Sequence, residues 1–535
     1  MSNSTPLDRS ERLIASLRQP AMYPGGDVTS VKVIETHISW VLLTGQFAYK
    51  IKKPVDLGFV DFSTLERRRL FCTEELRLNG RLAPNLYLAV VSVSVSPEAL
   101  ELVSDRQSFE YAVRMRQFQQ DDLLSHRAGH QGLSVELAIQ LAEVMARFHA
   151  EIPRAESADG FGTPAGVLAP VQANFDALET VVQQAASRAP EIARLLGDVR
   201  DWSLAEHTRL RETFDARLRN GCVRECHGDL HLGNIFVEWN RVVPFYGIEF
   251  NAGLRWIDVI SEAAFLSMDL EDRGEPTLSR LFFNAYLEAT GDYAGLKVYP
   301  FYRVYRAAVR AKVAGIRLQQ ESPSSPQYAE LLDEVLQYLS LAWSYTRPRQ
   351  QALVITSGLS GSGKTTAAVP LIEQLELIRI RSDVERKRMF GLRPAEQSHS
   401  AVGQGLYTLA ANRQTYDRLA ELAAEVLDSG FGVIVDATFL QRAGREPMRQ
   451  LARRHGVPFV ILQCTASDDV LRDRIRSRSA EGRDASEADL SVLSRQQHAQ
   501  EVLTDEERLH AVSVDTSAID DVSNRIVESV RSRMA

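Results

Sequence analysis

Residues 353–365 read LVITSGLSGSGKT, and the last eight of them, Gly358–Thr365, fit the pattern G-x-x-x-x-G-K-[ST] without deviation. An apolar strand pattern precedes this motif, and the helical pattern TTAAVPLIEQLEL follows it. Glycines let backbone N–H groups turn toward phosphate oxygens, and a helix N-terminus adds a favourable dipole. The stretch therefore predicts a nucleotide-phosphate loop, in which Lys364 reaches the β- and γ-phosphates and the Thr365 hydroxyl binds Mg²⁺. The residues expected to hold ATP are Gly358, Leu359, Ser360, Gly361, Ser362, Gly363, Lys364, Thr365 and Thr366.

Apolar strand patterns alternate with amphipathic helical patterns around this motif. The strand patterns are ALVITSG, LIRIRS, GVIVDAT, FVILQCT and HAVSVDT. Alternation of this kind is typical of a parallel sheet that helices cover on both faces. Residues 351–535 are therefore predicted to form an α/β P-loop NTPase domain with a five-stranded parallel sheet.

Charged residues follow the predicted strands where ligands gather in such sheets. Asp383 ends the second strand and is placed to take a proton from a substrate hydroxyl, with Arg386 one helical turn later to hold an anionic group. Asp436 ends the third strand and is expected to hold the water shell of Mg²⁺. The alternative for both aspartates is capping of the next helix. Arg474 and Arg478 are expected to be lid arginines that neutralise the transferring charge, the alternative being ordinary surface arginines.

At these residues, the segment 351–535 resembles the small P-loop kinases, a group that includes gluconate-kinase-like, polynucleotide-kinase-like and zeta-toxin-like proteins. The resemblance implies transfer of the γ-phosphate of ATP to a hydroxyl group. It does not name the acceptor.

A second phosphotransfer pattern lies at residues 227–234, which read HGDLHLGN and match H-x-D-L-x-x-x-N with glycine in place of arginine. In this pattern Asp229 meets the acceptor hydroxyl, and Asn234 turns back to bind Mg²⁺. Glu249 lies fifteen residues after Asn234, beyond a predicted hairpin. This is the position at which a second carboxylate ligand of the metal is expected. Glutamate also offers hard oxygen ligands to Mg²⁺.

The nucleotide lysine expected to accompany this pattern is Lys50. It lies in a predicted hairpin whose arms are residues 31–43 and 47–55, with a turn at 44–46. Glu75, on a predicted helix over 64–82, is the expected partner that holds Lys50, and Glu74 is the near alternative. Residues 36–39, THIS, are the only candidate for a loop that covers the nucleotide.

Residues 30–340 resemble the aminoglycoside phosphotransferase family, whose kinase-like α+β fold is shared by choline and fructosamine kinases. The family's usual second metal ligand is aspartate, so Glu249 is one methylene longer. Asp258 is either a structural carboxylate that hydrogen-bonds the catalytic loop or the second metal ligand itself, at a shifted position in the sequence. Asp258 lies only nine residues after Glu249. This spacing leaves no room for a segment that docks a peptide substrate, so it favours a small-molecule acceptor. Asp269, Glu271 and Asp272 are expected to form a solvated charged loop, with a cation-binding role as the alternative.

The whole chain resembles bacterial fusions of a phosphotransferase with an ATP-binding protein. The predicted domains are 1–345 (aminoglycoside phosphotransferase-like), 346–350 (linker) and 351–535 (P-loop). The expected function is ATP- and Mg²⁺-dependent phosphorylation of a small hydroxylated molecule, with two nucleotide sites. The alternative is a regulatory ATP-binding protein that combines a pseudokinase sensor with a P-loop switch.

The amino-acid composition argues against some classes of binding partner. The 62 Lys and Arg residues against 70 Asp and Glu residues give a net charge of −8 in 535 residues, which disfavours a nucleic-acid end kinase and membrane binding. Four cysteines are too few for a disulfide framework in a chain of this length. The polar start and the lack of a long apolar run predict a cytoplasmic protein. The oligomeric state is left open.

Overall fold

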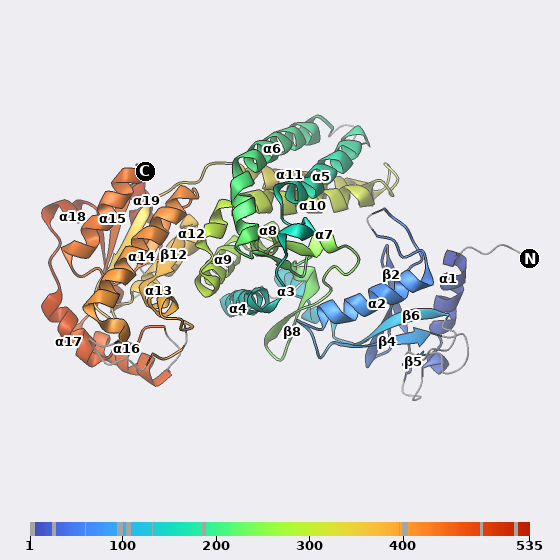
Figure 1. The fold of residues 1–535 in the computed structure, drawn as a ribbon, viewed down its shortest axis with the longest axis horizontal. Coiled ribbons are helices and arrows are strands. Elements are labelled where there is room, and N and C mark those ends of the chain that lie inside the picture. The colour runs from blue at the N-terminus through green and yellow to red at the C-terminus, as the bar shows by residue number, and fades with distance from the viewer. Residues whose placement is uncertain are drawn as a thin grey trace, which may run out of the picture. The chain divides into compact units, whose positions relative to one another are not determined.

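The computed structural model describes residues 6–23, 28–58, 60–93, 100–102, 109–130, 132–184, 189–394, 396–398, 405–481, 485–517 and 523–534. Figure 1 draws the helices and strands of the chain. The chain divides into two compact units. Unit 1 comprises residues 1–140, 147–176 and 211–269, and unit 2 comprises residues 141–146, 177–210 and 270–535. The predicted linker at 346–350 lies inside unit 2, and the predicted domain boundaries stay a prediction.

Unit 1 begins with an antiparallel sheet of six strands in the order β1-β2-β3-β6-β4-β5. The strands are β1 (Lys32–Glu35), β2 (Ser39–Leu43), β3 (Phe47–Lys52), β4 (Tyr87–Val93), β5 (Leu100–Leu102) and β6 (Glu110–Arg116). The predicted hairpin at 44–46 joins β2 to β3. Residues 31–43, expected as one arm, instead form two strands, because the Thr36 hydroxyl accepts a hydrogen bond from the backbone N–H of Ser39 (3.0 Å) and closes a turn.

Each face of this sheet packs against a different helix. Leu13 and Ile14 of α1 (Pro6–Leu17) share one apolar cluster with Tyr49 and Ile51 of β3. Cys72 of α2 (Leu65–Asn79) belongs to a cluster that contains alternate residues of β6. Because strand side chains alternate between faces, Lys50 and Lys52 point away from α1 and toward α2. This places two lysines beside the acidic side chains of α2.

The rest of unit 1 carries the second motif between short strands. The sheet is followed by α3 (Leu124–His130) and α4 (Val135–Glu151), and the motif lies between β7 (Val223–Glu225) and β8 (Ile235–Glu238). The predicted hairpin is formed by β8 and β9 (Arg241–Pro244), and β7 pairs with β10 (Trp256–Asp258). Helix α7 (Ala252–Arg255) lies wholly in unit 1, whereas α4, α5 (Pro164–Gln184), α6 (Ala189–Arg219) and α8 (Val259–Asp272) each contribute residues to both units. The kinase-like α+β fold expected for the N-terminal part is therefore confirmed.

All five strands predicted near the C-terminus are present in unit 2. They are β11 (Leu353–Ser357), β12 (Ile378–Arg381), β13 (Val433–Asp436), β14 (Phe459–Thr465) and β15 (Ala511–Asp515). They pair in parallel in the order β12-β13-β11-β14-β15. The apolar residues of β11 and β13 are fully buried, as expected for strands covered on both faces.

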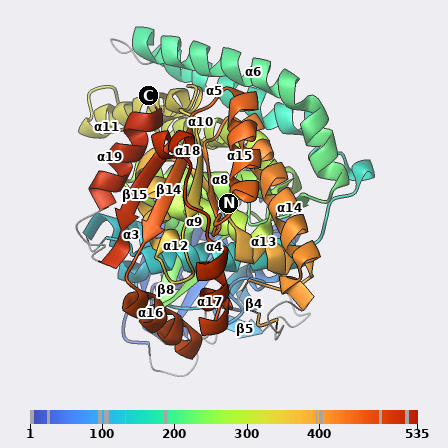
Figure 2. The ribbon, with the colours of Figure 1, turned by 90° about the vertical axis from the view of Figure 1, so that its left-hand side faces the viewer.

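Helices cover both faces of this sheet (Figure 2). Helix α12 (Lys364–Leu375) packs with α19 (Ser523–Met534), and α14 (Leu409–Asp428) packs with α15 (Arg442–His455). The remaining helices after the sheet's second strand are α13 (Ser382–Met389), α16 (Asp468–Glu481), α17 (Leu490–Ala499) and α18 (Asp505–Leu509). Unit 2 also contains α9 (Pro276–Thr290), α10 (Tyr299–Leu318) and α11 (Pro326–Tyr345). Among the described residues, none of the helices is long and apolar enough to span a bilayer.

Candidate phosphate and acceptor site

The phosphate loop runs from the end of β11 to the start of α12, and its glycines are required by its path. Gly358 adopts φ 150°, and a Cβ atom there would collide with the carbonyl oxygen of Cys464. Gly363 adopts φ 72° as the N-cap residue of α12. The left-handed conformation at such positions favours glycine strongly. The loop therefore directs its backbone toward a ligand at the N-terminus of α12.

Lys364 is the charged group of this loop. Its Nζ atom donates a hydrogen bond to the carbonyl oxygen of Leu359 (2.8 Å). Burial lowers the pKa of Lys364, and the nearby carboxylate of Asp436 opposes this effect in part. The ammonium group is thus held within the loop at the point where it would meet phosphate oxygens.

Thr365 and Asp436 lie together, as predicted. The Thr365 hydroxyl donates to Asp436 Oδ2 (2.8 Å), and Thr356 of β11 donates to Asp436 Oδ1 (3.2 Å). Asp436 does not cap the next helix, because α15 begins later and has Gln441 as its N-cap. A hydroxyl and a carboxylate at this distance form the hard-oxygen donor set that Mg²⁺ requires, so the residues present fit the metal.

The predicted acceptor residues belong to α13, which follows β12. Asp383 lies in the first turn, and the N-cap of the helix is Arg381, so Asp383 is not a capping residue. The Asp383 carboxylate acts electrostatically on Lys364 and, like Asp436, opposes in part the lowering of the Lys364 pKa by burial. Arg386 is buried and donates to the carbonyl oxygen of Leu406 (3.1 Å) and to Asn412 Oδ1 (3.0 Å). Its Nε atom is buried and has no partner among the described residues.

The predicted lid arginines lie on α16 and contact the site differently. Arg474 donates to the loop carbonyl of Gly361 (3.3 Å) and to the carbonyl oxygen of Thr516 (2.7 Å). Arg478 donates to the carbonyl oxygen of Ala488 (2.8 Å) and acts electrostatically on Lys364. Arg474 is therefore attached to the loop itself, and Arg478 lies close to its lysine.

Two side chains that hydrogen-bond the backbone of the phosphate loop were not predicted from the sequence. Gln496 of α17 accepts a hydrogen bond from the backbone N–H of Ser360 (2.8 Å). Thr516, directly after β15, donates to the carbonyl oxygen of Ser362 (3.0 Å). Neither belongs to a recognisable motif, although the position of Thr516 at the carboxyl end of a parallel strand is a signal that marks such residues.

Helix α9 supports the strand that leads to the acceptor residues. Glu288 of α9 accepts from Arg379 Nη2 (3.2 Å) and from Arg381 Nη1 (3.0 Å). Arg388 of α13 donates to the backbone oxygen of Glu288. Burial alone would raise the pKa of Glu288, but the two arginines outweigh it and lower the pKa. The position of α13 thus depends on a helix that lies far from it in the sequence.

In unit 1, the predicted ion pair between Lys50 and Glu75 is present. Lys50 Nζ lies 2.7 Å from Glu75 Oε1, and both side chains are buried. Glu74, the near alternative, instead pairs with Arg77 near the surface. Burial alone would lower the pKa of Lys50, but the charge of Glu75 outweighs it and raises the pKa. Lys50 therefore stays protonated in its buried position.

A second buried lysine, which the sequence analysis did not single out, changes the surroundings of Glu249. Lys52 Nζ donates to Glu75 Oε2 (2.7 Å) and also to Glu249 Oε1. The Tyr246 ring centroid lies 3.7 Å from Lys50 Nζ. Two lysines and two glutamates therefore form a neutral buried cluster, and one oxygen of the predicted metal ligand Glu249 already has a cationic partner.

Asp229 and Asn234 are brought together, as expected. Asn234 Nδ2 donates to Asp229 Oδ2 and to the Asp229 carbonyl oxygen, both at 2.9 Å. Two carboxylates hold the backbone of the loop that carries them. Glu262 Oε1 accepts a hydrogen bond from the backbone N–H of Gly228 (2.6 Å), and Asp269 Oδ2 accepts one from the backbone N–H of Leu232 (2.8 Å). These anchors come from one helix, α8.

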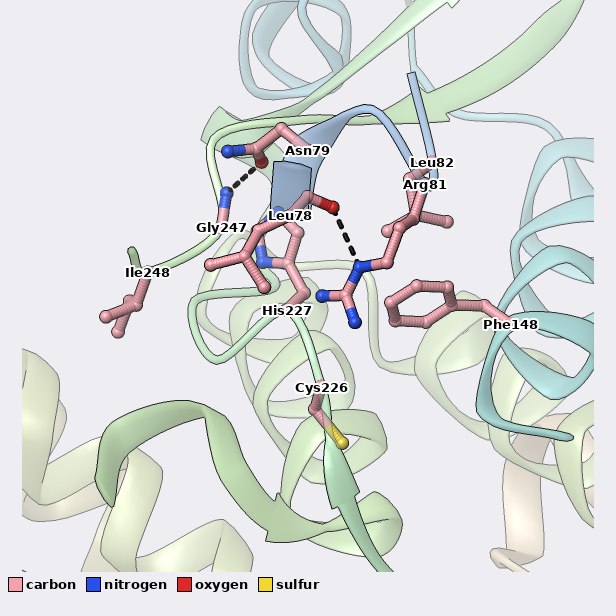
Figure 3. A pocket seen from close by; sticks show the side chains of 9 residues that line it. All are labelled: Leu78, Asn79, Arg81, Leu82, Phe148, Cys226, His227, Gly247 and Ile248. Carbon is pink, nitrogen blue, oxygen red and sulfur yellow. Dashed lines mark hydrogen bonds between the residues drawn. The ribbon is translucent and has the colours of Figure 1, made fainter. Parts of the chain in front are cut away.

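The segment after β9 is fixed beside this loop. Asn79 Oδ1 accepts from the backbone N–H of Gly247 (2.6 Å), and His227 Nε2 hydrogen-bonds the carbonyl oxygen of Phe245 (2.8 Å). Figure 3 shows Asn79, His227 and Gly247 around a cavity of only about 10 Å³. A cavity of that volume holds about one water molecule, so it is a packing space rather than a substrate site.

Two expectations for acidic residues were wrong. Asp258 does not bond the catalytic loop: it pairs with Arg217 of α6 (2.8 Å) and accepts from the backbone N–H of Ile260 (2.9 Å). Asp269, Glu271 and Asp272 do not form a solvated loop, because they lie on α8. Asp269 is fully buried, and Glu271 accepts from Arg303 and from the Tyr345 hydroxyl (2.8 Å).

Glu262 should make the stability of unit 1 depend on acid pH. Burial alone would raise its pKa, but the hydrogen bond from His149 (2.8 Å) and the neighbouring positive charge lower the pKa from 4.5 to about 2. A lowered carboxyl pKa contributes stability above pH 4.5, and this contribution is lost as the pH falls from 4.5 toward 2. Glu262→Gln should therefore cost about 3 kcal/mol at neutral pH and reduce the pH dependence in that window, to which other carboxyls of lowered pKa such as Glu75 and Glu225 also contribute.

Urea unfolding between pH 3 and 7 (roughly the range in which this linkage is visible) measures this effect. Glu66→Gln is the matched control, because Glu66 is an exposed glutamate of α2. A Glu262→Gln chain with unchanged stability at neutral pH would contradict the anchoring role.

Comparisons with known proteins give one family match and several similar chains. The AAA domain family matches residues 353–503. Uncharacterized proteins of Mycobacterium tuberculosis and Mycobacterium bovis are 31% identical over 477 residues, which is 89% of this chain and 92% of theirs. A gluconokinase from Sinorhizobium meliloti is 20% identical and covers 35% of this chain and 93% of its own (TM-score 0.25). A choline/ethanolamine kinase family protein from Mesorhizobium loti is 12% identical and covers 62% of this chain and 99% of its own (TM-score 0.33).

The fold and site together define a protein in which a kinase-like α+β part precedes an α/β part with a phosphate loop. The strand order, the complete phosphate loop and the paired Lys50 and Glu75 carry this assignment. The chain belongs to the same family as the mycobacterial proteins, and the matched length exceeds either predicted domain, so the relationship includes parts of both.

Proposed function

We propose that the P-loop part of the chain transfers the γ-phosphate of ATP to a hydroxyl group of a small molecule. The observation that carries this proposal is the contact between Thr365 and Asp436 (2.8 Å) beside a complete phosphate loop. These two side chains would hold Mg²⁺, which neutralises charge on the β- and γ-phosphates when it is bound. The same arrangement recurs in enzymes that move phosphoryl groups.

The chain's own residues have distinct tasks in this reaction. The loop N–H groups and Lys364 bind the phosphates, and Lys364 stabilises the charge that builds up on the transferring group. The Asp383 carboxylate accepts the proton of the acceptor hydroxyl. At the same time the hydroxyl oxygen of the acceptor forms a bond to the γ-phosphorus, and the bond between that phosphorus and the β–γ bridging oxygen, which leaves with ADP, breaks. Arg386 is assigned to an anionic group of the acceptor, and its guanidinium group would have to turn toward it, because both Nη atoms are engaged and the Nε atom is buried. Arg474 and Arg478 on α16 close over the loop.

The acceptor is inferred to be small and not a nucleic acid. The net charge of −8 gives no general attraction to a polyanion. The regulatory alternative is less favoured, because Asp383 and Arg478 lie near Lys364 and a nucleotide switch has no need of a base beside the phosphates.

A second nucleotide site in unit 1 is part of the proposal. Lys50 with Glu75 and Asp229 with Asn234 are the pairs that a kinase-like site uses to hold phosphates, metal and acceptor. Glu249 would serve as the second metal carboxylate only through the oxygen that Lys52 does not engage. This site is therefore expected to bind nucleotide more weakly than the phosphate loop does.

A screen of hydroxylated metabolites tests the transfer activity. The full chain is incubated with ATP, Mg²⁺ and pooled metabolites, and mass spectrometry detects any compound that gains a phosphate. The Lys364→Ala chain serves as the control, so a product that persists in this variant is assigned to unit 1. If neither chain phosphorylates any pool, the small-molecule proposal fails.

The proposed base gives a sharper prediction. Asp383→Asn should slow transfer to the acceptor by about 10²–10⁴-fold while ATP affinity stays nearly unchanged, because this side chain touches the acceptor rather than the nucleotide. Steady-state kinetics and ATP titration measure the two quantities separately. An equal loss of ATP affinity would place Asp383 on the nucleotide or its metal.

A further inference from the structure

A second cavity lies in unit 2, at the end of α12 opposite the phosphate loop. Its volume is about 440 Å³, which is within the range of pockets that hold small molecules. It is bordered by the end of α11, the segment 347–350, the end of α12 and the C-terminal helix α19. Its lining is dominated by arginine, so we name it the arginine pocket.

The most buried arginine of this pocket, Arg303, has one donor atom without a partner among the described residues. Arg303 is buried, its Nη1 atom donates to Glu376 Oε1 (3.2 Å), and its Nη2 atom donates to Glu271. The Tyr345 ring centroid lies 3.6 Å from its guanidinium carbon. Its Nε atom is buried and has no hydrogen-bond partner in the described part of the chain. A buried donor without a partner is costly, so the guanidinium group of Arg303 is not fully satisfied by the two glutamates.

The pocket also carries more positive than negative charge. Glu376 is shared between Arg303 and Arg349, whose Nε atom lies 3.4 Å away. Arg280, Arg347 and Arg531 line the pocket as well, and among the described residues none of the three makes an ion pair within contact distance. Arg280 donates to the backbone oxygen of Glu373 and acts electrostatically on Glu376. Five arginines against the two glutamates that line the cavity leave an excess of three positive charges.

The pocket is connected to the phosphate loop by a single helix. Helix α12 begins at Lys364 and ends at Leu375, and the next residue, Glu376, lines the pocket. Glu376 adopts the left-handed conformation with φ 54°, which is unfavourable for a residue other than glycine. Its bonds to Arg303 and Arg349 hold it there. A ligand that competes for these arginines would release Glu376 and so alter the end of α12.

We propose that the arginine pocket binds a small phosphorylated molecule and that its occupancy changes the phosphate loop through α12. Phosphate fits the lining because each group brings up to two charges and several acceptor oxygens on one centre, which suits the planar fork of arginine. The proposal does not rest on the proposed transfer activity, because binding here leaves Lys364 and Asp383 unused.

Pyrophosphate is the probe, and the Lys364→Ala full chain is the parent, so that the phosphate loop contributes little binding. Arg347→Ala combined with Arg349→Ala should weaken pyrophosphate binding by at least about tenfold in calorimetric titration. The matched control is Arg453→Ala combined with Arg454→Ala, two exposed arginines of α15 outside the pocket, which should leave the affinity unchanged. Equal thermal melting of both double variants establishes that each is folded.

Three results would overturn the proposal. The binding site is refuted if the parent chain does not bind pyrophosphate, or if the pocket variant and the control bind it equally well. The connection to the loop is read by hydrogen exchange of residues 358–376 in the parent chain, where pyrophosphate should change the exchange rate at both ends of α12. A change confined to residues 374–376 refutes that connection.

Discussion

Lys364→Ala should lower the ATP affinity of the phosphate loop by at least about a hundredfold and remove nearly all transfer from that site. The lysine is the one charged side chain that the loop directs at the β- and γ-phosphates, and loss of a single such contact in a water-excluded site costs about 3–4 kcal/mol. Its Nζ atom is already in the loop, 2.8 Å from the carbonyl oxygen of Leu359, so ATP binding needs only a local movement of the side chain.

Calorimetric titration of the full chain with Mg-ATP measures this loss. Arg453→Ala on the exposed face of α15 is the matched control, because it removes one positive charge from the same part of the chain without touching the loop. Unchanged affinity and turnover in the Lys364→Ala chain would contradict the assignment of residues 358–365 as the phosphate site.

The parallel sheet could be predicted from the sequence because its strands are buried on both faces. The central residues 353–355 (LVI) and 433–435 (VIV) are continuously apolar, which is the pattern of strands that helices cover on both faces. The pairing of Thr365 with Asp436 followed from the same logic, since residues at the carboxyl ends of parallel strands meet at one edge of the sheet.

Residues in less regular surroundings were harder to predict. Helix α1 was missed because only Leu13, Ile14 and Leu17 anchor it to the sheet, and its remaining positions are mostly polar. The acidic residues 269–272 appeared solvent-facing because their partners, Arg303 among them, come from helices that a local pattern cannot locate.

Lys52 was missed although the sequence held the signal. Strand side chains alternate, so Lys50 and Lys52 must share the face that Glu75 approaches. A strand prediction that assigns the nucleotide lysine at one position therefore also predicts a second buried lysine two residues later. Gln496 gave no such signal, because its contact with Ser360 depends on the packing of α17 alone.

The full chain should bind two nucleotides, and Lys364→Ala should reduce this number to one. Lys50→Ala in the Lys364→Ala background should then weaken the remaining binding by at least about tenfold, because the lysine that Glu75 positions is lost. Asp229→Ala in the same background should preserve binding and abolish transfer from unit 1, because the base contacts the acceptor rather than the phosphates. Equilibrium titration with Mg-ATP gives the number of sites.

Lys53→Ala is the matched control for the Lys50 change. Lys53 follows the same strand but pairs with Glu35 (2.6 Å) near the surface, so its loss removes an equal charge outside the buried cluster. Glu249→Asp adds a test of the proposed metal role. The shorter side chain draws the carboxylate away from Lys52. This change should raise the activity of unit 1 only if Lys52 restrains Glu249 in the native chain. If the Lys364→Ala chain binds no nucleotide in the presence of Mg²⁺, the cluster around Lys52 serves structure alone, and unit 1 has no kinase activity.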